Sequence, residues 1–245
     1  MTESKLAELL QIKPDERILD IGGSMKQLLE IKVDTLVDLI LPSESRYNNG
    51  KLRAKKFVRL DIEKNILPFK DKEFDICICS HTLEDLHHPF LVMDEISRVA
   101  KRGIVIVPSR GIDSEFTKIN FTNWGTGARR LPGMSHHNWF FEVQNEKLIV
   151  IPKNYPLLYS SDMQIIKWTG EEECVYLWKG KIDYTYNQQL NLDMKELILN
   201  YKEFLHNNTN KIKLGTTLVY VDNPILFGIE YAKKLLKKNR KNTFA

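Results

Sequence analysis

Four short apolar runs in the first third of the chain end in residues that could bind a ligand. These residues are Asp20 with Gly22 and Gly23, Asp38, Asp61, and Ser80 with His81. If the runs are strands of a parallel sheet, their carboxyl ends share one edge, and ligands bind there where the strand order reverses. We therefore expect these residues to form one site.

The residues after the first run indicate which ligand the site would take. Glycines let a ligand approach the backbone with no Cβ in the way, and amides of a helix capped by Ser24 could bind an anion. Asp38 follows Asp20 by 18 residues, close to the ~20-residue interval at which an acid accepts the ribose hydroxyls of a dinucleotide. However, the segment Asp20–Lys26 lacks the G-x-G-x-x-G fingerprint, which disfavours a nicotinamide-dependent oxidoreductase. An acid before the glycines would repel a pyrophosphate and favour an ammonium group, such as the amino-acid end of S-adenosylmethionine.

The elements that must position these residues follow from apolar periodicity. We expect short, nearly all-apolar strands at residues 17–21, 35–38, 56–61, 74–80 and 104–107, with a loop or short helical turn over 42–55. Helices are predicted over 4–12, after Ser24 with Leu28, Leu29 and Ile31, and over 89–101 with an Asp94–Arg98 pair and Gly103 as its end. The predicted fold is α/β, a Rossmann-like parallel sheet sandwiched by helices.

The second half of the chain predicts a C-terminal α+β appendage. Hairpins are expected from 139–143 with 148–151 and from 175–177 with 182–186, followed by helices around 197–205 and after Asn223-Pro224. We assign residues 1–155 to the core and 156–245 to the appendage packed on it. The long irregular stretch 109–137 is expected to be functional.

The first half of the chain resembles class I S-adenosylmethionine-dependent methyltransferases. The resemblance covers about residues 15–110 and rests on the order of several motifs. They are Arg17–Gly23 for the first motif, Leu60–Glu63 with Leu67–Phe69 and Phe74-Asp75 for the third strand, Ser80–Leu86 for the "S-H-x-L-E-H" stretch of small-molecule methyltransferases, and Met93–Val99 through Pro108 for the following helix and strand.

The resemblance implies S-adenosylmethionine as cofactor and gives a set of binding residues. In the family the acid matched by Asp38 holds the ribose, whereas the acid matched by Asp61 and the next amide, that of Ile62, bind the adenine. The full set is Asp20, Gly22, Gly23, Ser24, Asp38, Leu39, Asp61, Ile62, Ser80 and His81. Two departures stand out: Ser24 replaces a usual glycine, and Asp85 stands where many relatives carry histidine.

Histidines are the candidates for a general base. His81 is considered first, because in the family that strand end faces the transferred methyl, and His136 and His137 are the other candidates. The alternative is a cap, a surface position or a supporting role. Two adjacent pairs, His87-His88 and His136-His137, invite a zinc site, but no cysteine pair or H-x₃-H spacing supports one, so no metal is predicted.

The acceptor is less well defined than the cofactor. The stretch Ser135–Phe141 is loosely similar to methyltransferases found among polysaccharide-modifying enzymes, so a small-molecule or glycan acceptor, methylated at oxygen, is expected. Four aromatic residues could stack on the acceptor, although packing in the core is their favoured role. They are Trp124, Trp139, Phe140 and Phe141. The alternatives are a catalytically silent cofactor-binding module and an RNA methyltransferase. The absence of an Asn-Pro-Pro-aromatic motif disfavours DNA adenine methylation.

Composition sets the remaining limits. The chain has 245 residues and a net charge of +4, and its basic tail over 233–241 leaves about −2 for the rest. We expect the tail to be a solvated helix end rather than a nucleic-acid contact, and Glu171–Glu173 to be a solvated loop.

Cys77 and Cys79 suit buried, reduced thiols and therefore a cytoplasmic location. Neither a signal peptide nor a membrane-spanning segment is expected, and the oligomeric state is left open.

Overall fold

The main sheet is Rossmann-like, as the sequence predicted, and it contains one strand more than the five expected ones. The computed structural model describes residues 1–45, 50–116, 132–134, 136–158 and 164–215. The strand order is β3-β2-β1-β4-β5-β9, in which the first five are parallel and β9 is antiparallel to β5. These strands are β1 (Ile18–Ile21), β2 (Thr35–Asp38), β3 (Lys56–Arg59), β4 (Phe74–Ser80), β5 (Ala100–Pro108) and β9 (Glu173–Lys179).

Alternate residues of β4 and β5 face two separate cores, which is why both strands are apolar throughout. Cys77 and Cys79 lie in the larger core with α2 (Pro89–Val99), whereas Ile76 and Ile78 face α1 (Glu3–Leu10). This two-sided burial is the property of a parallel sheet that periodicity predicts. The thiols are free and buried, as expected.

Two details predicted for α2 are wrong. The helix ends at Val99, and Gly103 lies inside β5, where its missing side chain allows close approach of β4. Arg98 pairs with Glu95 and Asp71 instead of Asp94, because Asp94 accepts a hydrogen bond from the Tyr184 hydroxyl.

The helix predicted after β1 does not form, so Ser24 caps no helix. Residues 22–33 make an irregular loop, and only η1 (Pro42–Glu44) gives a short helical turn in the later connection, as expected. Remote side chains satisfy the loop's amides: Glu3 accepts from the N–H groups of Leu29 and Glu30. The Ser24 hydroxyl donates to the Ile40 carbonyl at 2.6 Å. These long-range bonds replace the local ones that a helix would make.

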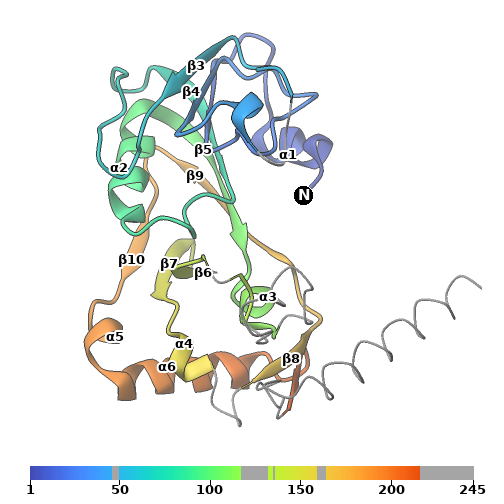
Figure 1. Ribbon diagram of the computed structural model, residues 1–245, viewed down its shortest axis with the longest axis vertical. Coiled ribbons are helices and arrows are strands. Elements are labelled where there is room, and N and C mark those ends of the chain that lie inside the picture. Colours follow the sequence, from blue (N-terminus) through green and yellow to red (C-terminus); the bar gives the residue numbers. More distant parts are fainter. Residues whose placement is uncertain (46–49, 117–131, 135, 159–163, 216–245) are drawn as a thin grey trace, which may run out of the picture.

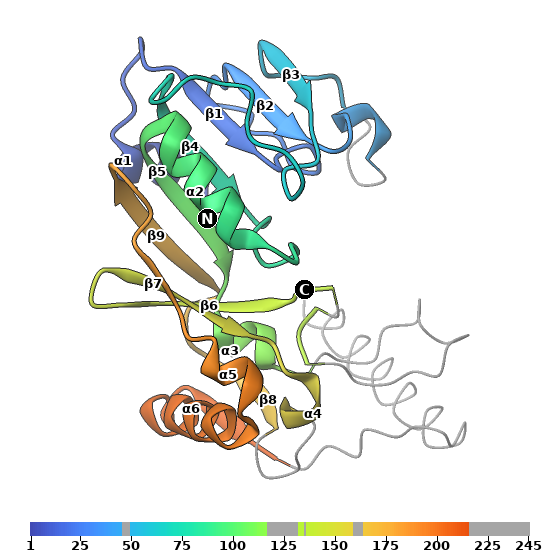
Figure 2. The same ribbon diagram turned by 90° about the vertical axis from the view of Figure 1, so that its left-hand side faces the viewer.

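A smaller sheet and a group of helices lie below the main sheet in Figures 1 and 2. The hairpin of β6 (Trp139–Gln144) and β7 (Lys147–Pro152) forms as predicted. The other elements are β10 (Tyr184–Tyr186), α3 (Arg110–Ser114), α4 (Tyr155–Leu158), α5 (Gln189–Leu192), α6 (Met194–Asn207), β8 (Ile165–Trp168) and β11 (Ile212–Leu214). The helix predicted around 197–205 is α6; the one after Asn223 and the basic tail lie outside the described residues.

The second predicted hairpin is wrong, because its two strands belong to different sheets. β9 extends the main sheet along β5, whereas β10 pairs in parallel with β7. The division at residue 155 stays a prediction, although β9, from the later segment, lies in the main sheet (Figure 2). Among the described residues, no helix is long and apolar enough to cross a membrane.

Gly103 tests the close packing of β4 against β5. A Cβ at this position would lie 2.1 Å from the Cys77 carbonyl oxygen and 2.9 Å from the Trp178 ring. Gly103→Ala should therefore lower the free energy of unfolding by about 3 kcal/mol, the upper end for overpacking. Gly180→Ala is the matched control: it has open space and only the strain of its positive φ, which costs about 1–2 kcal/mol. Urea unfolding measures both, and equal losses would contradict this account.

Candidate active site

The predicted binding residues lie at one edge of the main sheet. Strand register places Ile21 beside both Val37 and Cys79, and Asp38 beside Arg59. The residues that follow β1, β2, β3 and β4 therefore emerge at the same edge. The strand order reverses between β1 and β4, which is where a sheet of this type opens a crevice.

The glycine turn after β1 packs directly on the loop after β4. Gly22 has φ +79°, and a Cβ there would lie 2.1 Å from the Thr82 hydroxyl oxygen. That hydroxyl donates to the carbonyls of Ile21 and Ser80, each at 3.2 Å. Thr82 thus ties the ends of the two central strands together. The sequence analysis did not select Thr82, because a lone threonine gives no signal.

Asp20 is a buried carboxylate without a partner. Its residue is 4% exposed, and no hydrogen bond or ion pair to its side chain is found in the part of the chain that the structure describes. A Cβ on Gly23 would lie 2.0 Å from Asp20 Oδ2, so the carboxylate packs beneath that glycine. Burial, and secondarily the charge of Asp38, raise the pKa of Asp20 to about 7. A buried polar group of this kind requires an explanation.

Asp38, also predicted to bind the cofactor, anchors the glycine loop. The Ser24 amide donates to Asp38 Oδ2 at 2.9 Å, and the Ile40 amide approaches Oδ1 at 3.3 Å. Each carboxylate oxygen keeps further acceptor capacity. The adjacent Leu39 is exposed.

Asp61 and Ile62 follow β3 at the same edge. Asp61 pairs with Lys64 at 2.7 Å, and this hydrogen bond is the largest of the effects that lower its pKa. Ile62 packs against the larger core.

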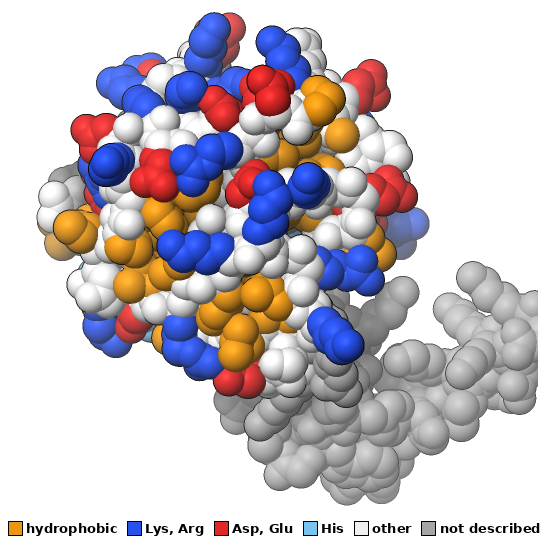
Figure 3. All heavy atoms as spheres, turned by 90° about the horizontal axis from the view of Figure 1, so that it is seen from above, with side chains coloured by type: hydrophobic (Ala, Val, Ile, Leu, Met, Phe, Trp, Pro, Cys, Tyr) orange, Lys and Arg blue, Asp and Glu red, His pale blue; other side chains and the backbone are white. Residues whose placement is uncertain are grey.

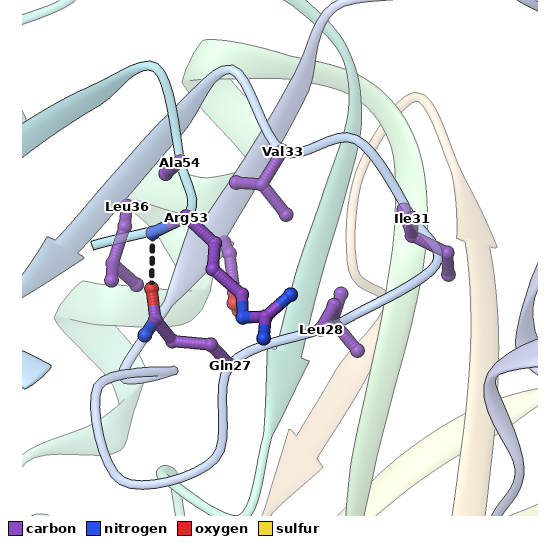
Figure 4. A pocket seen from close by; sticks show the side chains of 8 residues that line it. Gln27, Leu28, Ile31, Val33, Leu36, Arg53 and Ala54 are labelled. Carbon is purple, nitrogen blue, oxygen red and sulfur yellow. Dashed lines mark hydrogen bonds between the residues drawn. The ribbon is translucent and has the colours of Figure 1, made fainter. Parts of the chain in front are cut away.

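A small cavity lies beside Asp20, between the glycine loop and the segment before β3 (Figure 4). Gln27 joins its two sides, because it accepts from the Arg53 amide at 2.8 Å and donates to the Lys51 carbonyl at 3.0 Å. The cavity is lined by Asp20, Gln27, Leu28, Ile31, Val33, Leu36, Arg53 and Ala54.

His81 lies between two carboxylates. Its φ of 52° directs the chain away from Ser80 at the end of β4. Nδ1 is 3.3 Å from Glu84 and Nε2 is 3.4 Å from Glu173. The hydrogen bond to Glu84 is the main cause that raises the pKa of His81. Glu173, expected in a solvated loop, instead begins β9 and faces this histidine.

His136 and His137 are brought to the same loop after β4. The Asn138 amide donates to the Glu84 carbonyl at 2.7 Å, and its side chain donates to the Asp85 carbonyl at 2.8 Å. Both histidine Nε2 atoms lie 3.6 Å from Asp85 Oδ1. The predicted catalytic histidines His136 and His137 therefore lie beside Asp85, on the loop that begins with His81.

The aromatic residues near this loop serve packing. Phe140 and Phe141 are buried, and the Trp139 indole packs on Phe90 and donates to the Leu86 carbonyl at 2.8 Å. This is the role favoured for them from the sequence. Trp124 lies outside the described residues.

Solved structures with partial similarity to this chain include two bacterial proteins. A SAM-dependent methyltransferase from Aquifex aeolicus is 23% identical, with 48% of this chain and 67% of that chain covered and a TM-score of 0.34. The YcgJ protein from Bacillus subtilis is 20% identical, with 44% and 52% covered and a TM-score of 0.33. The chain thus spans about half the length of the latter. A comparison with curated proteins finds no match.

A family model gives the broader match. The model described as methionine biosynthesis protein MetW matches residues 4–147, which run from α1 into β7 and include the whole edge described above. The sheet order and the motifs at its edge are those of class I S-adenosylmethionine-dependent methyltransferases. The chain therefore belongs to the MetW family and has the fold of these methyltransferases.

Proposed function

We propose that this protein transfers a methyl group from S-adenosylmethionine to a hydroxyl of a small-molecule or carbohydrate-type acceptor. The observation that carries the cofactor assignment is the buried, unpartnered carboxylate of Asp20 where the strand order reverses. A lone buried carboxylate costs free energy unless a cation or hydrogen-bond donor joins it. The ammonium of the cofactor's amino-acid end supplies both.

The other predicted residues along the edge would contact the remaining parts of the cofactor. Gly22 and Gly23 let the ligand approach the backbone, and Asp38 offers free lone pairs to the ribose hydroxyls. Asp61 and the Ile62 amide would bind the adenine, with Leu39 and Ser80 at the two sides. Acids lie at three successive strand ends of this edge, which favours a cationic ligand over a dinucleotide.

Methyl transfer requires orientation more than activation. The bound sulfonium supplies an activated methyl group: the acceptor oxygen forms the new C–O bond as the S–CH₃ bond breaks, and the electron pair stays on sulfur. Positioned reactants contribute about 7–11 kcal/mol to such a step. The acceptor's proton must go to a base, for which His81, His136 and His137 remain the candidates.

His81 is less suited than the other two histidines to accept the acceptor's proton. Both of its nitrogens face carboxylates, and its raised pKa favours the protonated ring. We infer that it orders the loop after β4 and does not take the acceptor's proton. His136 and His137 then remain on the side of the loop where an acceptor would meet the methyl group.

A small acceptor agrees with two further observations. The family description concerns methionine biosynthesis, which involves small molecules. The molecular face seen in Figure 3 mixes Lys and Arg with Asp and Glu, so this face offers no continuous basic stripe for a nucleic acid. A cytoplasmic location stays a prediction from the free thiols.

S-adenosylhomocysteine should raise the melting temperature, and Asp38→Ala should remove most of that shift. A ligand at 100 times its Kd stabilises a fold by about 2.7 kcal/mol, and Asp38 is assigned both the ribose and the Ser24 amide. Thermal denaturation with increasing ligand measures the effect. Asp15→Ala, at an exposed turn, is the control that should keep the full shift. The absence of a shift at millimolar ligand would refute the cofactor assignment.

The affinity for S-adenosylhomocysteine should rise with pH between about 5.5 and 7. Asp20, with a pKa of about 7, must lose its proton to receive the ammonium, so binding releases a proton. Linkage predicts roughly tenfold tighter binding across this interval. Asp38 and Arg53 are the charged neighbours of Asp20, and Asp20→Asn isolates its contribution. Calorimetry should find weak, pH-independent binding for that variant; a retained pH slope would exclude Asp20 as its source.

A further inference from the structure

Asp85, His136 and His137 bring three potential metal ligands to one point. One carboxylate oxygen and one nitrogen from each ring all lie within 4.8 Å of one another. The sequence disfavoured a metal here because adjacent histidines rarely point at a common centre. In this structure the two rings stand at 80° to each other, with centroids 4.6 Å apart, and both present Nε2 toward the Asp85 carboxylate.

The distances within this cluster suit a shared ion better than direct hydrogen bonds. Each Nε2 lies 3.6 Å from Asp85 Oδ1, which is beyond hydrogen-bond range. Ligand atoms at about 2.0–2.1 Å from a tetrahedral ion are separated by roughly 3.4 Å. Two of the three separations are therefore close to those around a small divalent cation, and the third is at most 4.8 Å.

The surroundings of His137 place a carboxylate beside its second ring nitrogen. Its Nδ1 lies 3.0 Å from Asp113 Oδ1, and His137 is 6% exposed. Asp113 is itself held by the Lys153 ammonium at 2.9 Å and by the Met134 amide at 3.0 Å. A carboxylate on the second ring nitrogen is the usual partner of a metal-bound histidine, because it fixes the tautomer and strengthens the ligand.

The opposite side of the cluster is open. The side chains of His136 and Asp85 are 63% and 44% exposed, so solvent or a substrate oxygen can reach the centre. Three protein ligands with an open position are the arrangement of catalytic rather than structural metal sites. We propose that Asp85, His136 and His137 bind a divalent transition-metal ion, with Asp113 as the outer partner of His137.

The ligand atoms, two imidazole nitrogens and one carboxylate oxygen, indicate which ion would bind. Nitrogen ligands suit Zn²⁺ or a similar first-row ion, whereas Mg²⁺ prefers oxygen ligands. The site lies on the loop after β4, and Asn138 ties its two segments together. If the proposed methyl transfer is correct, the ion would bind the acceptor hydroxyl and lower its pKa. The proton would then pass to solvent at the open side, because His136 and His137 would act as ligands and not as bases.

The test is metal binding to the full chain, without cofactor or acceptor. After removal of metals by a chelator, Co²⁺ titration should give visible d–d absorption that saturates at about one equivalent per chain, and calorimetry should show Zn²⁺ binding but none for Mg²⁺. His136→Ala should weaken Zn²⁺ binding at least about tenfold. Its ring is exposed, so the fold should be unaffected, as circular dichroism would verify.

His87→Ala is the matched control, since His87 is an exposed histidine on the same loop outside the cluster. It should bind Zn²⁺ as the parent does, whereas Asp113→Asn should weaken binding without removing a ligand. Equal affinity in the His136 and His87 variants, or no binding of Co²⁺ and Zn²⁺ at tens of micromolar, would overturn the site. These readouts are independent of S-adenosylhomocysteine binding, so the metal site and the proposed function can fail separately.

Discussion

The site depends on a carboxylate held in an apolar edge of the sheet without a countercharge. Asp20 lies one residue before the end of β1 and packs beneath Gly23. It lies close enough to Asp38 for the two charges to oppose each other. Such an arrangement is unfavourable in the free protein and becomes favourable when a cation binds. The surrounding structure supplies the rigidity that prevents its relaxation: β1 is buried on both faces, and Thr82 fixes the glycine turn against β4.

The loop after β4 is the second organising feature. It carries His81 and Asp85 on opposite sides of the buried Glu84, and each pairs with a segment remote in sequence. His81 faces Glu173 of β9, whereas Asp85 faces the histidines that precede β6. One loop therefore joins the cofactor edge to the smaller sheet, and the proposed acceptor chemistry lies where these parts meet.

The irregular loop after β1 shows how tertiary contacts can replace local structure. Its amides are bonded by Glu3 of α1 and Asp38 of β2, and Gln27 attaches it to the segment before β3. These long-range hydrogen bonds satisfy amides that would otherwise be bonded within a helix. The same bonds link α1, β2 and the glycine turn into one connected edge.

The sequence alone determined the sheet, because strands buried on both faces are apolar throughout and their ends carry the acids and glycines of the cofactor edge. It also selected His81, His136 and His137. Tertiary structure decided what local pattern cannot encode. The residues after Ser24 form a loop and not a helix, because their amides bond to Asp38 and Glu3. β9 pairs with β5 and not with its predicted hairpin partner. In both places, partners distant in sequence replaced local ones. The meeting of Asp85 with His136 and His137, and the support from Asp113 and Lys153, depend on chain reversals that no spacing rule anticipates.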